Sequence, residues 1–584
     1  MTSIWDGLLE VDPEGKLAPA IAEEWGTEDE GLTWTFKIRD GVKWVNVNGE
    51  EMADCNAQDF ATGLEWVLNF HKNDSLNTSM PLEMIDGAEE YYEYTKSLSK
   101  EEAYALTAEE GSTFREMVGL ETPDDYTLVY RCLDKKPYFD TLAPYASLYP
   151  ASQQLIDQLG VDGFKAINNE NMWYNGCYTM TSFIQNNEKI YTKNPLYWDQ
   201  DCTLFNTVTV KMVESNEVAF QLYQSGEVDY TSLGEAQINT IAKDPNNEFY
   251  DYMVPGVPSK YCYQFQLNYN KLFEDGTPDV NWNTAVANEA FRLSWWYGLD
   301  LKEYYKRTNA VDPMVCENNF YTMKGLVYTS DGTDYTELVR QEMGLPESNG
   351  ETMVRLDAEK AQQYKEQAME ELTALGVTFP VSVDYHISAS SQTALDSANV
   401  LKQIFSDCLG DDYVQLNIKT YVSSLRKEVT QAHLHSFIIN GWGADYGDPQ
   451  NYLGQQRYGY DNAYYSTTYS YVNDLTEETE ANKDLLNAYK EFTKMVDAAD
   501  AITNDLDARY EAYAKAEAYF LQHALTIPCY YGIGWCLTKI DNDSKMFAMY
   551  GCQNDKMKNW ETNSNGYTSE EKGVSEQIAA FTAQ

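Results

Sequence analysis

The sequence predicts a folded α/β protein whose domains are interleaved along the chain, and three observations support this expectation. Strand-like and helix-like segments alternate through the second half of the chain. Strand-like segments also occupy the first 50 residues and return after residue 170. No linker rich in Pro, Gly or Ser separates these blocks, although 584 residues are enough for about three or four domains.

The first half of the chain has strand patterns on both sides of a mixed region. Residues 32–39 (LTWTFKIR) alternate apolar and polar side chains, as a half-buried strand does, and Asn48-Gly49 favours a tight turn. A later helix-like segment ends at Gly226. The elements expected here are strands at residues 32–39, 126–132, 189–193 and 207–213 and helices at residues 59–71 and 217–225.

The second half of the chain contains a βαβ pattern. Residues 381–387 (VSVDYHI) alternate as a strand, and residues 391–409 place apolar side chains at helical spacing before Gly410. Residues 414–418 then alternate again, and two strands joined by a helix lie parallel. The other elements expected are an amphipathic helix at residues 357–375, a strand at 435–440, a helix at 507–524 and a doubly buried strand at 526–537.

The composition excludes one class of partner and leaves another question open. The chain has 42 Lys and Arg residues against 92 Asp and Glu residues, a formal net charge of −50, whereas proteins that bind nucleic-acid phosphates need a basic surface. Its 46 Tyr and 13 Trp residues indicate a folded chain, because disordered acidic chains are poor in aromatics. These aromatics either pack normally or line a cleft that holds sugars or peptides by stacking.

Signatures of catalysis and metal binding are absent from the sequence. It has no phosphate-binding G-x-x-x-x-G-K-[ST] loop, no H-E-x-x-H and no G-x-S-x-G. The ten cysteines are scattered without a CxxC pair, and His433 and His435 have no third metal ligand nearby in the sequence. We therefore expect no cofactor, no metal and no enzymatic activity. A glycoside hydrolase with paired carboxylates stays an open alternative, since 92 acidic residues produce such pairs by chance.

The sequence also lacks the common membrane and export signals. No run of about 18 apolar residues could span a bilayer. No basic region followed by an apolar run comes after Met1. From these patterns alone, the chain is either cytoplasmic or has lost an export segment.

The segment after the strand expected at residues 435–440 is the strongest candidate for a ligand loop. It reads Gly441-Trp442-Gly443-Ala444-Asp445-Tyr446-Gly447-Asp448-Pro449. Ligands of open α/β sheets bind beyond the carboxyl ends of the strands. Gly441 and Gly443 permit close approach of a ligand backbone. Trp442 offers a stacking face, and Asp445 supplies a negative charge suited to an ammonium group.

Asp448 has a simpler structural explanation than ligand binding. It stands directly before Pro449, and an acidic residue followed by proline is typical of a helix N-cap with proline at the first helical position. We therefore expect a helix to begin at this point.

Several short motifs in order resemble the periplasmic or surface oligopeptide-binding proteins of ABC importers, bacterial solute-binding protein family 5. The matching segments are WDGLL at 5–9, LAPAIAEEW at 17–25, LTWTFKIRDGVKW at 32–44, QDF at 58–60, NGCY at 175–178, KNPLYW at 193–198, SGEVD at 225–229, YAKAE at 513–517 and IPCYY at 527–531. The similarity extends from Trp5 to about Leu537. No single motif decides the assignment, but their order and spacing do.

The resemblance implies a two-lobed periplasmic-binding-protein-like fold of type II with an extra inserted subdomain. Lobe one is expected to comprise residues 1–50, 171–255 and 525–584, with the inserted subdomain at 51–170 and lobe two at 256–524. Two crossings, near residues 253–263 and 524–531, would act as hinges. The lobes would close on the ligand because the closed state binds it better.

The resemblance also implies a ligand site. Asp445 would accept the α-ammonium of a bound peptide, while Gly441 and Gly443 would offer main-chain hydrogen bonds that tolerate any peptide side chain. Asp6 matches an acidic position near the cleft in some members. Ile439 stands where some relatives carry a basic residue for the ligand carboxylate, which leaves recognition of the peptide C-terminus open. The expected ligand-binding residues are Asp445, Trp442, Gly441, Gly443, Tyr263, Tyr531 and Asp6.

The function implied by the resemblance is capture of oligopeptides and hand-over to the permease subunits of an ABC importer, without bond breaking. We expect a monomer that is extracytoplasmic, at the cell surface, and lipid-anchored through a segment upstream of the residues present. Two alternatives stay open: an oligosaccharide-binding receptor of the same fold, and a secreted glycoside hydrolase.

Overall fold

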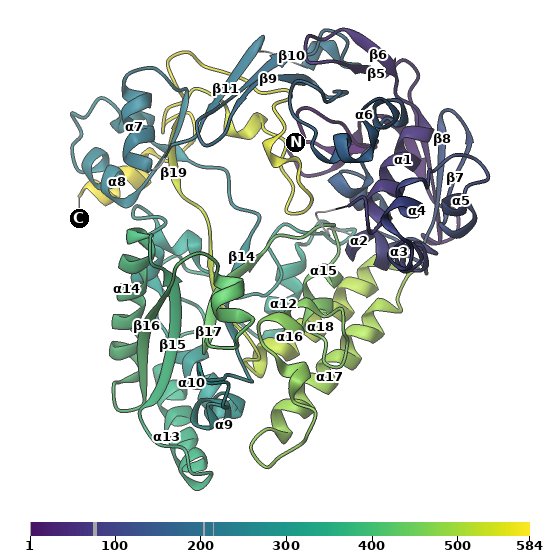
Figure 1. The fold of residues 1–584 in the computed structure, drawn as a ribbon. Helices are drawn as coiled ribbons and strands as arrows, with labels where there is room; N and C mark the ends of the chain where they lie inside the picture. Colours follow the sequence, from purple (N-terminus) through teal and green to yellow (C-terminus); the bar gives the residue numbers. More distant parts are fainter. Residues whose placement is uncertain (1, 74–78, 203–204, 214, 584) are drawn as a thin grey trace. The chain divides into compact units, whose positions relative to one another are not determined.

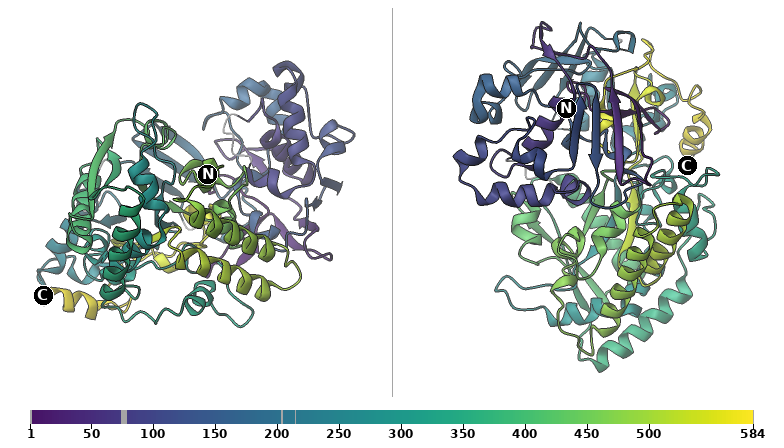
Figure 2. Two further views of the ribbon diagram at one scale, coloured as in Figure 1. Left: turned by 90° about the horizontal axis from the view of Figure 1, so that it is seen from below. Right: turned by 90° about the vertical axis from the view of Figure 1, so that its right-hand side faces the viewer.

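The computed structural model describes residues 2–73, 79–202, 205–213 and 215–583, which form two compact units (Figure 1; Figure 2). Unit 1 comprises Met1–Asp229, Asp445–Gly447 and Lys539–Gly566. Unit 2 comprises Tyr230–Ala444, Asp448–Thr538 and Tyr567–Gln584. Each unit therefore contains segments that are far apart in the sequence, as the absence of linkers predicts. The finer lobe and subdomain boundaries stay a prediction.

Unit 1 contains a four-stranded antiparallel sheet in the order β3-β4-β8-β7. Its strands are β3 (Ala22–Gly26), β4 (Thr33–Ile38), β8 (Thr127–Arg131) and β7 (Leu120–Asp124). Trp34, Phe36 and Ile38 of β4 are buried, so the alternation in the sequence correctly gives the inward face. Helix α1 (Ala57–Leu68) begins with a capping box between Asn56 and Asp59.

A second sheet of unit 1 has the antiparallel order β11-β10-β9. The strands are β9 (Tyr178–Ile184), β10 (Glu188–Lys193) and β11 (Thr207–Lys211), close to the expected ranges. Tyr174, Tyr178 and Tyr197 form part of a separate apolar core in this region. The helix expected at residues 217–225 is α7 (Asn216–Gln224).

Unit 2 is built around a mixed five-stranded sheet in the order β16-β15-β17-β14-β18. Strands β15 (Val381–Ser388) and β16 (Val414–Tyr421) are parallel, and α14 (Gln392–Leu409) joins them, which confirms the βαβ prediction. Figure 1 shows α14 lying along these strands. Strand β14 (Cys262–Leu267) runs antiparallel to both β17 (Phe437–Trp442) and β18 (Ile527–Tyr531).

Two expected strands differ from the structure. The apolar run expected as one strand at 526–537 forms β18 and then β19 (Trp535–Thr538), which lies in a different sheet with β12 (Tyr230–Leu233) and β13 (Val254–Pro255). Gly532 and Gly534 stand at the break, where the chain leaves the first sheet. Strand β17 extends two residues beyond the expected end, because Trp442 and Gly441 pair with β14.

Unit 2 contains long helices close to the ranges expected from the sequence. The predicted helix at 507–524 is α18 (Leu506–Gln522), which packs against α17 (Lys483–Asp500). The predicted helix at 357–375 is α13 (Ala358–Ala374), capped by Asp357. In the part of the chain that the structure describes, no helix has both the length and the apolar composition needed to cross a bilayer.

Candidate functional site

The candidate site begins in unit 2, where Gly441 lies opposite Tyr263 in the β17–β14 pair. A methyl group at Gly441 would lie 2.8 Å from Cδ1 of Tyr263, so glycine permits this ring to lie across the strand. The ring of Tyr263 also stacks on Tyr530, with centroids 4.5 Å apart and planes within 3°. Burial raises the pKa of Tyr263. The structure thus brings together Gly441 and Tyr263, two of the residues expected to bind the ligand.

One edge of β17 is left without a strand partner along most of its length. β15 pairs with β17 only between Tyr385 and Phe437, and no other described strand lies on that side. Ile438 is still buried, whereas the four residues from Ile439 to Trp442 are half-buried. Their backbone groups on this edge resemble those of an edge strand, which an extended chain can pair with.

The side chain of Trp442 is held by polar and aromatic neighbours. Its Nε1 donates to Oδ1 of Asn451 at 2.8 Å, and its carbonyl accepts from the Tyr452 hydroxyl at 3.2 Å. Its ring centroid lies 6.0 Å from those of Tyr464 and Tyr465. The indole is therefore fixed in orientation while remaining half-buried.

Gly443 follows, and a methyl group there would lie about 3.0 to 3.1 Å from the Lys260 and Tyr261 side chains. Such contacts leave little room for a side chain at this position. These side chains of unit 2 favour glycine at position 443, in addition to the close approach of a ligand that glycine would permit.

The next three residues, Asp445 to Gly447, group with unit 1. Tyr446 is buried and stacks on Tyr138 with centroids 5.2 Å apart and planes within 8°. The Gly447 N–H donates to Oγ1 of Thr141 at 2.9 Å. Asp445 is half-buried, directly before these two anchored residues. The contacts of Tyr446 and Gly447 therefore tie the backbone next to Asp445 to unit 1.

Asp448 fixes the end of the loop in unit 2 through a buried ion pair with Arg509. Oδ2 lies 2.9 Å from Nε and Oδ1 lies 2.9 Å from Nη2, a bidentate arrangement between side chains that are 0 % and 2 % exposed. Oδ1 also accepts the Gln450 N–H at 2.9 Å, at the start of the short helix α15 (Gln450–Leu453). A helix thus begins here, but Pro449 and not Asp448 occupies its N-cap position, one residue later than expected. The ion pair with Arg509 was not predicted from the sequence.

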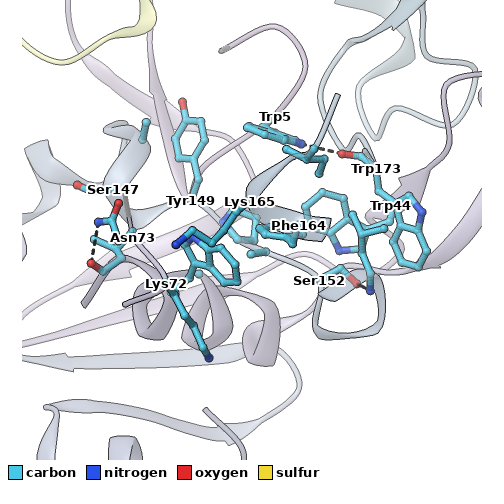
Figure 3. Close-up of a pocket in the computed structure, with 18 residues that line it drawn as sticks. Trp5, Trp44, Lys72, Asn73, Ser147, Tyr149, Ser152, Phe164, Lys165 and Trp173 are labelled. Carbon is cyan, nitrogen blue, oxygen red and sulfur yellow. Dashed lines mark hydrogen bonds between the residues drawn. The ribbon is translucent and has the colours of Figure 1, made fainter. Parts of the chain in front are cut away.

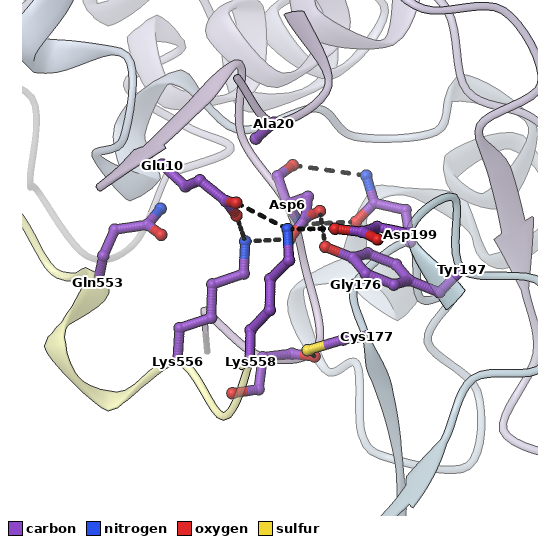
Figure 4. A network of polar contacts seen from close by, with 12 residues as sticks. Asp6, Glu10, Ala20, Gly176, Cys177, Tyr197, Asp199, Gln553, Lys556 and Lys558 are labelled. Carbon is purple, nitrogen blue, oxygen red and sulfur yellow. Dashed lines mark hydrogen bonds and ion pairs between the residues drawn. The ribbon is translucent and has the colours of Figure 1, made fainter. Parts of the chain in front are cut away.

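Asp6 takes part in a buried charge network of unit 1 (Figure 4). Its Oδ1 is 2.8 Å from Nζ of Lys556, and its Oδ2 accepts from the Tyr197 hydroxyl at 2.8 Å and from Nε1 of Trp198 at 2.9 Å. Lys556 also pairs with Glu10 at 2.6 Å. The side chain of Asp6 is 0 % exposed and is bonded within the protein, so its geometry does not support contact with a ligand.

Tyr531 ends β18 and is paired in register with Cys262. The residue is 7 % exposed, and burial raises its pKa. Its hydroxyl is buried with no hydrogen-bond partner among the described residues. Tyr531 therefore offers one hydrogen-bonding group that the protein itself does not satisfy.

The chain forms two α/β units that are interleaved along the sequence, and one of them contains a mixed five-stranded sheet. These features define a two-lobed solute-binding fold. The model of the bacterial extracellular solute-binding proteins, family 5 Middle, matches residues 16–464, and the chain belongs to this family. The resemblance inferred from the sequence motifs is thereby confirmed.

Relatives and solved structures agree with this assignment. The oligopeptide-binding protein AmiA of Streptococcus pneumoniae is 27 % identical over 549 residues, covering 90 % of this chain and 79 % of the relative. The oligopeptide-binding protein SarA of Streptococcus gordonii is 26 % identical and covers 94 % of this chain and 82 % of its own. Peptide-bound OppA of Listeria monocytogenes has a TM-score of 0.66 at 20 % identity, covering 96 % and 94 % of the two chains. The predicted fold class is confirmed.

Proposed function

We propose that this chain is the extracytoplasmic receptor of an ABC importer, which captures oligopeptides and delivers them to the permease subunits. The observation that supports this function best is the edge of β17 that lacks a strand partner beyond Phe437. An extended peptide can add to such an edge through main-chain hydrogen bonds, which do not depend on its side chains. The relatives named above are oligopeptide-binding proteins.

Asp445 supplies the charge in this proposal. It comes three residues after Trp442, where β17 ends, and its side chain is half-buried. A carboxylate in such a position forms a stronger hydrogen bond with an ammonium group than it does in water. We infer that Asp445 binds the peptide's α-ammonium, with Gly441, Gly443 and Trp442 beside the peptide backbone.

The two tyrosines are proposed to have different roles at the same site. Tyr263 is half-buried and stacked, so it offers an ordered ring wall in unit 2. Tyr531 offers the buried hydroxyl described above. Asp6 is omitted from the proposed ligand set, because its carboxylate is taken up by Lys556, Tyr197 and Trp198.

Further parts of the proposal rest on the family assignment. We infer that the chain binds and releases its ligand without breaking bonds, acts as a monomer, and works outside the cytoplasm at the cell surface, held by a lipid anchor on an upstream segment. The lobe and hinge boundaries expected from the sequence belong to the same proposal. No particular observation favours an oligosaccharide ligand or a hydrolase.

The test combines identification of a natural ligand with a charge control. Native mass spectrometry of the freshly purified protein is expected to find bound peptides. Calorimetry is then expected to show that N-acetylation lowers the affinity for a short peptide by about thirtyfold, equivalent to about 2 kcal/mol. Equal affinity of free and acetylated peptides would contradict the role of Asp445. Binding of neutral oligosaccharides without any peptide would contradict the receptor function proposed here.

A further inference from the structure

Unit 1 contains a cavity of about 480 Å³ that shares no residue with the proposed peptide site (Figure 3). It lies beside α1 and α6 (Gln153–Lys165). All of its lining residues fall between Trp5 and Trp173. Six of them are aromatic: Trp5, Trp44, Trp66, Tyr149, Phe164 and Trp173. The cavity therefore has the aromatic lining that is typical of a small-molecule site.

Several of these rings are held in place by contacts within the protein. Nε1 of Trp5 donates to the Trp173 carbonyl at 2.7 Å, as Figure 3 shows. The Trp66 and Phe164 rings meet edge to face, with centroids 4.6 Å apart. Rings fixed in this way leave a preformed space whose walls can stack on, or meet edge-on, a flat guest. A cavity of about 150 Å³ already holds benzene, so one ring system of two fused rings fits here.

One polar group in the lining has no partner. Ser147 is 6 % exposed, and its Oγ makes no hydrogen bond to any described residue. Buried hydroxyl groups are nearly always hydrogen-bonded in native proteins. The Ser147 hydroxyl is therefore available to a polar atom of a molecule inside the cavity.

The charge of the lining differs from that of the chain as a whole. The chain has 92 acidic and 42 basic residues, yet the lining contains Lys72 and Lys165 and no Asp or Glu. Nζ of Lys72 lies 2.7 Å from Oε2 of Glu65, so this ammonium is partly compensated. Nζ of Lys165 donates to the His71 carbonyl at 2.9 Å. A cation in this cavity would meet two lysines without a lining carboxylate, whereas a neutral or anionic guest would not be repelled.

We propose that this cavity binds a small planar aromatic molecule, neutral or anionic, whose ring lies among the tryptophans and whose polar atom bonds to Ser147. This site is independent of peptide capture. An indole is a suitable probe, because its N–H can donate to Oγ of Ser147 while its ring fills the aromatic space.

The charge requirement is tested with three probes that share one ring. Saturation-transfer NMR and calorimetry on the full chain are expected to show saturable binding of indole and indole-3-acetate, with tryptamine weaker by about tenfold or more. Equal binding of tryptamine would overturn the charge argument. Failure of indole and indole-3-acetate to bind would overturn the proposal, leaving the cavity as a place for water only.

The location is tested by filling the cavity. Ala151 lines it, and Ala151→Phe is expected to weaken the binding of indole by at least about tenfold. The control Ala105→Phe, at an exposed position of the same unit, should leave indole binding unchanged. If Ala151→Phe lowers the melting temperature, Ala146→Leu replaces it, since Ala146 also lines the cavity. Unchanged indole affinity in a folded cavity-filling variant would show that the ligand binds elsewhere and overturn the proposal.

The hydrogen bond is tested separately with Ser147→Ala. The variant is expected to bind indole about two- to tenfold more weakly, the range for one net hydrogen bond, and toluene with unchanged affinity. Equal losses for indole and toluene would overturn the role of Ser147. Peptide binding should persist in all of these variants, so a failure of this site is distinguishable from a failure of the proposed receptor function.

Discussion

Arg509 and Asp448 form a bidentate ion pair with almost no solvent exposure, immediately after the proposed peptide-binding segment. Nη1 of Arg509 also donates to the backbone carbonyls of Ala499, Asp500 and Ile502. The pair therefore ties the end of the segment to both α17 and α18. Its cost of desolvation is offset by a nearly complete set of hydrogen bonds.

Removing one member of this pair is expected to destabilise the protein strongly. Arg509→Met leaves the Asp448 carboxylate buried without its partner, and such changes cost about 3–5 kcal/mol. Urea unfolding measures the effect. As a control, Lys483→Ala breaks the exposed pair with Glu480 and should cost less than about 1 kcal/mol. Similar losses for the two variants would contradict the structural weight given to Arg509.

Asp445→Ala is expected to weaken binding of a short free peptide by about thirtyfold or more, or about 2 kcal/mol, because the peptide ammonium loses its partner. Calorimetry with Asp445→Asn, which keeps the shape and removes the charge, should give a similar loss. An acetylated peptide should bind the wild type and both variants alike. A loss of the same size for the acetylated peptide would mean that the substitution acts on structure and not on the charge contact.

Gly441→Ala should reduce both stability and peptide affinity. Its methyl group would lie 2.8 Å from the Tyr263 ring, and overpacking of this kind costs about 1–3 kcal/mol. Combining it with Tyr263→Ala should recover part of the loss, with a coupling energy of about 1 kcal/mol. Gly26→Ala, where a methyl group meets nothing within 4 Å, is the matched control. Strict additivity of the two changes at Gly441 and Tyr263 would refute their contact.

The stability of unit 1 should fall as the pH rises through the pKa of Asp59. Burial raises its pKa to about 6, from an ordinary value near 4, so the folded state binds this proton more tightly than the unfolded state does. The stabilisation is therefore complete below about pH 4 and is lost as the pH rises through 6, by up to about 3 kcal/mol.

Asp59→Asn isolates this contribution. Urea unfolding of the wild type and the variant between pH 4 and pH 7.5 should show the variant gaining relative stability as the pH rises. The amide retains the shape next to Nε1 of Trp44, which donates to Oδ2 of Asp59 at 3.1 Å. A stability difference that does not change with pH would contradict the raised pKa.

Asp6→Asn should lower stability without changing the peptide affinity of the folded protein. The change removes a buried charge 2.8 Å from Lys556, leaving that ammonium with less compensation. Thermal unfolding and calorimetry on the same sample measure the two effects. A large loss of peptide affinity in a fully folded variant would restore Asp6 to the ligand site that the family resemblance suggests.

Elements defined by local periodicity could be predicted from the sequence. The βαβ unit of β15, α14 and β16 is an example, because the apolar spacing and Gly410 are local signals. The end of β17 could not be placed, since its last residues are strand only through pairing with β14, far away in the chain. The break between β18 and β19 contains two glycines. The apolar residues around them made the whole run resemble one buried strand.

Charged partners distant in the sequence were the main omission at the site. Arg509 is 61 residues from Asp448, and Lys556 is 546 residues from Glu10, so no spacing rule connects them. The resemblance to family members points to the segment around Asp445, whose role stays a prediction, but it gives Asp6 a role that its burial does not support. Side-chain partners of this kind depend on tertiary structure, which composition and periodicity do not encode.

The edge of β17 without a strand partner has a consequence for the empty protein. The main-chain groups of this edge, which are proposed to bind a peptide, can also pair with the same edge of another copy, the first step of edge-to-edge aggregation. The net charge of −50 opposes this, because two copies repel each other before their strands can meet. Raising the ionic strength screens that repulsion, so cargo-free protein should be the form most prone to self-association in salt.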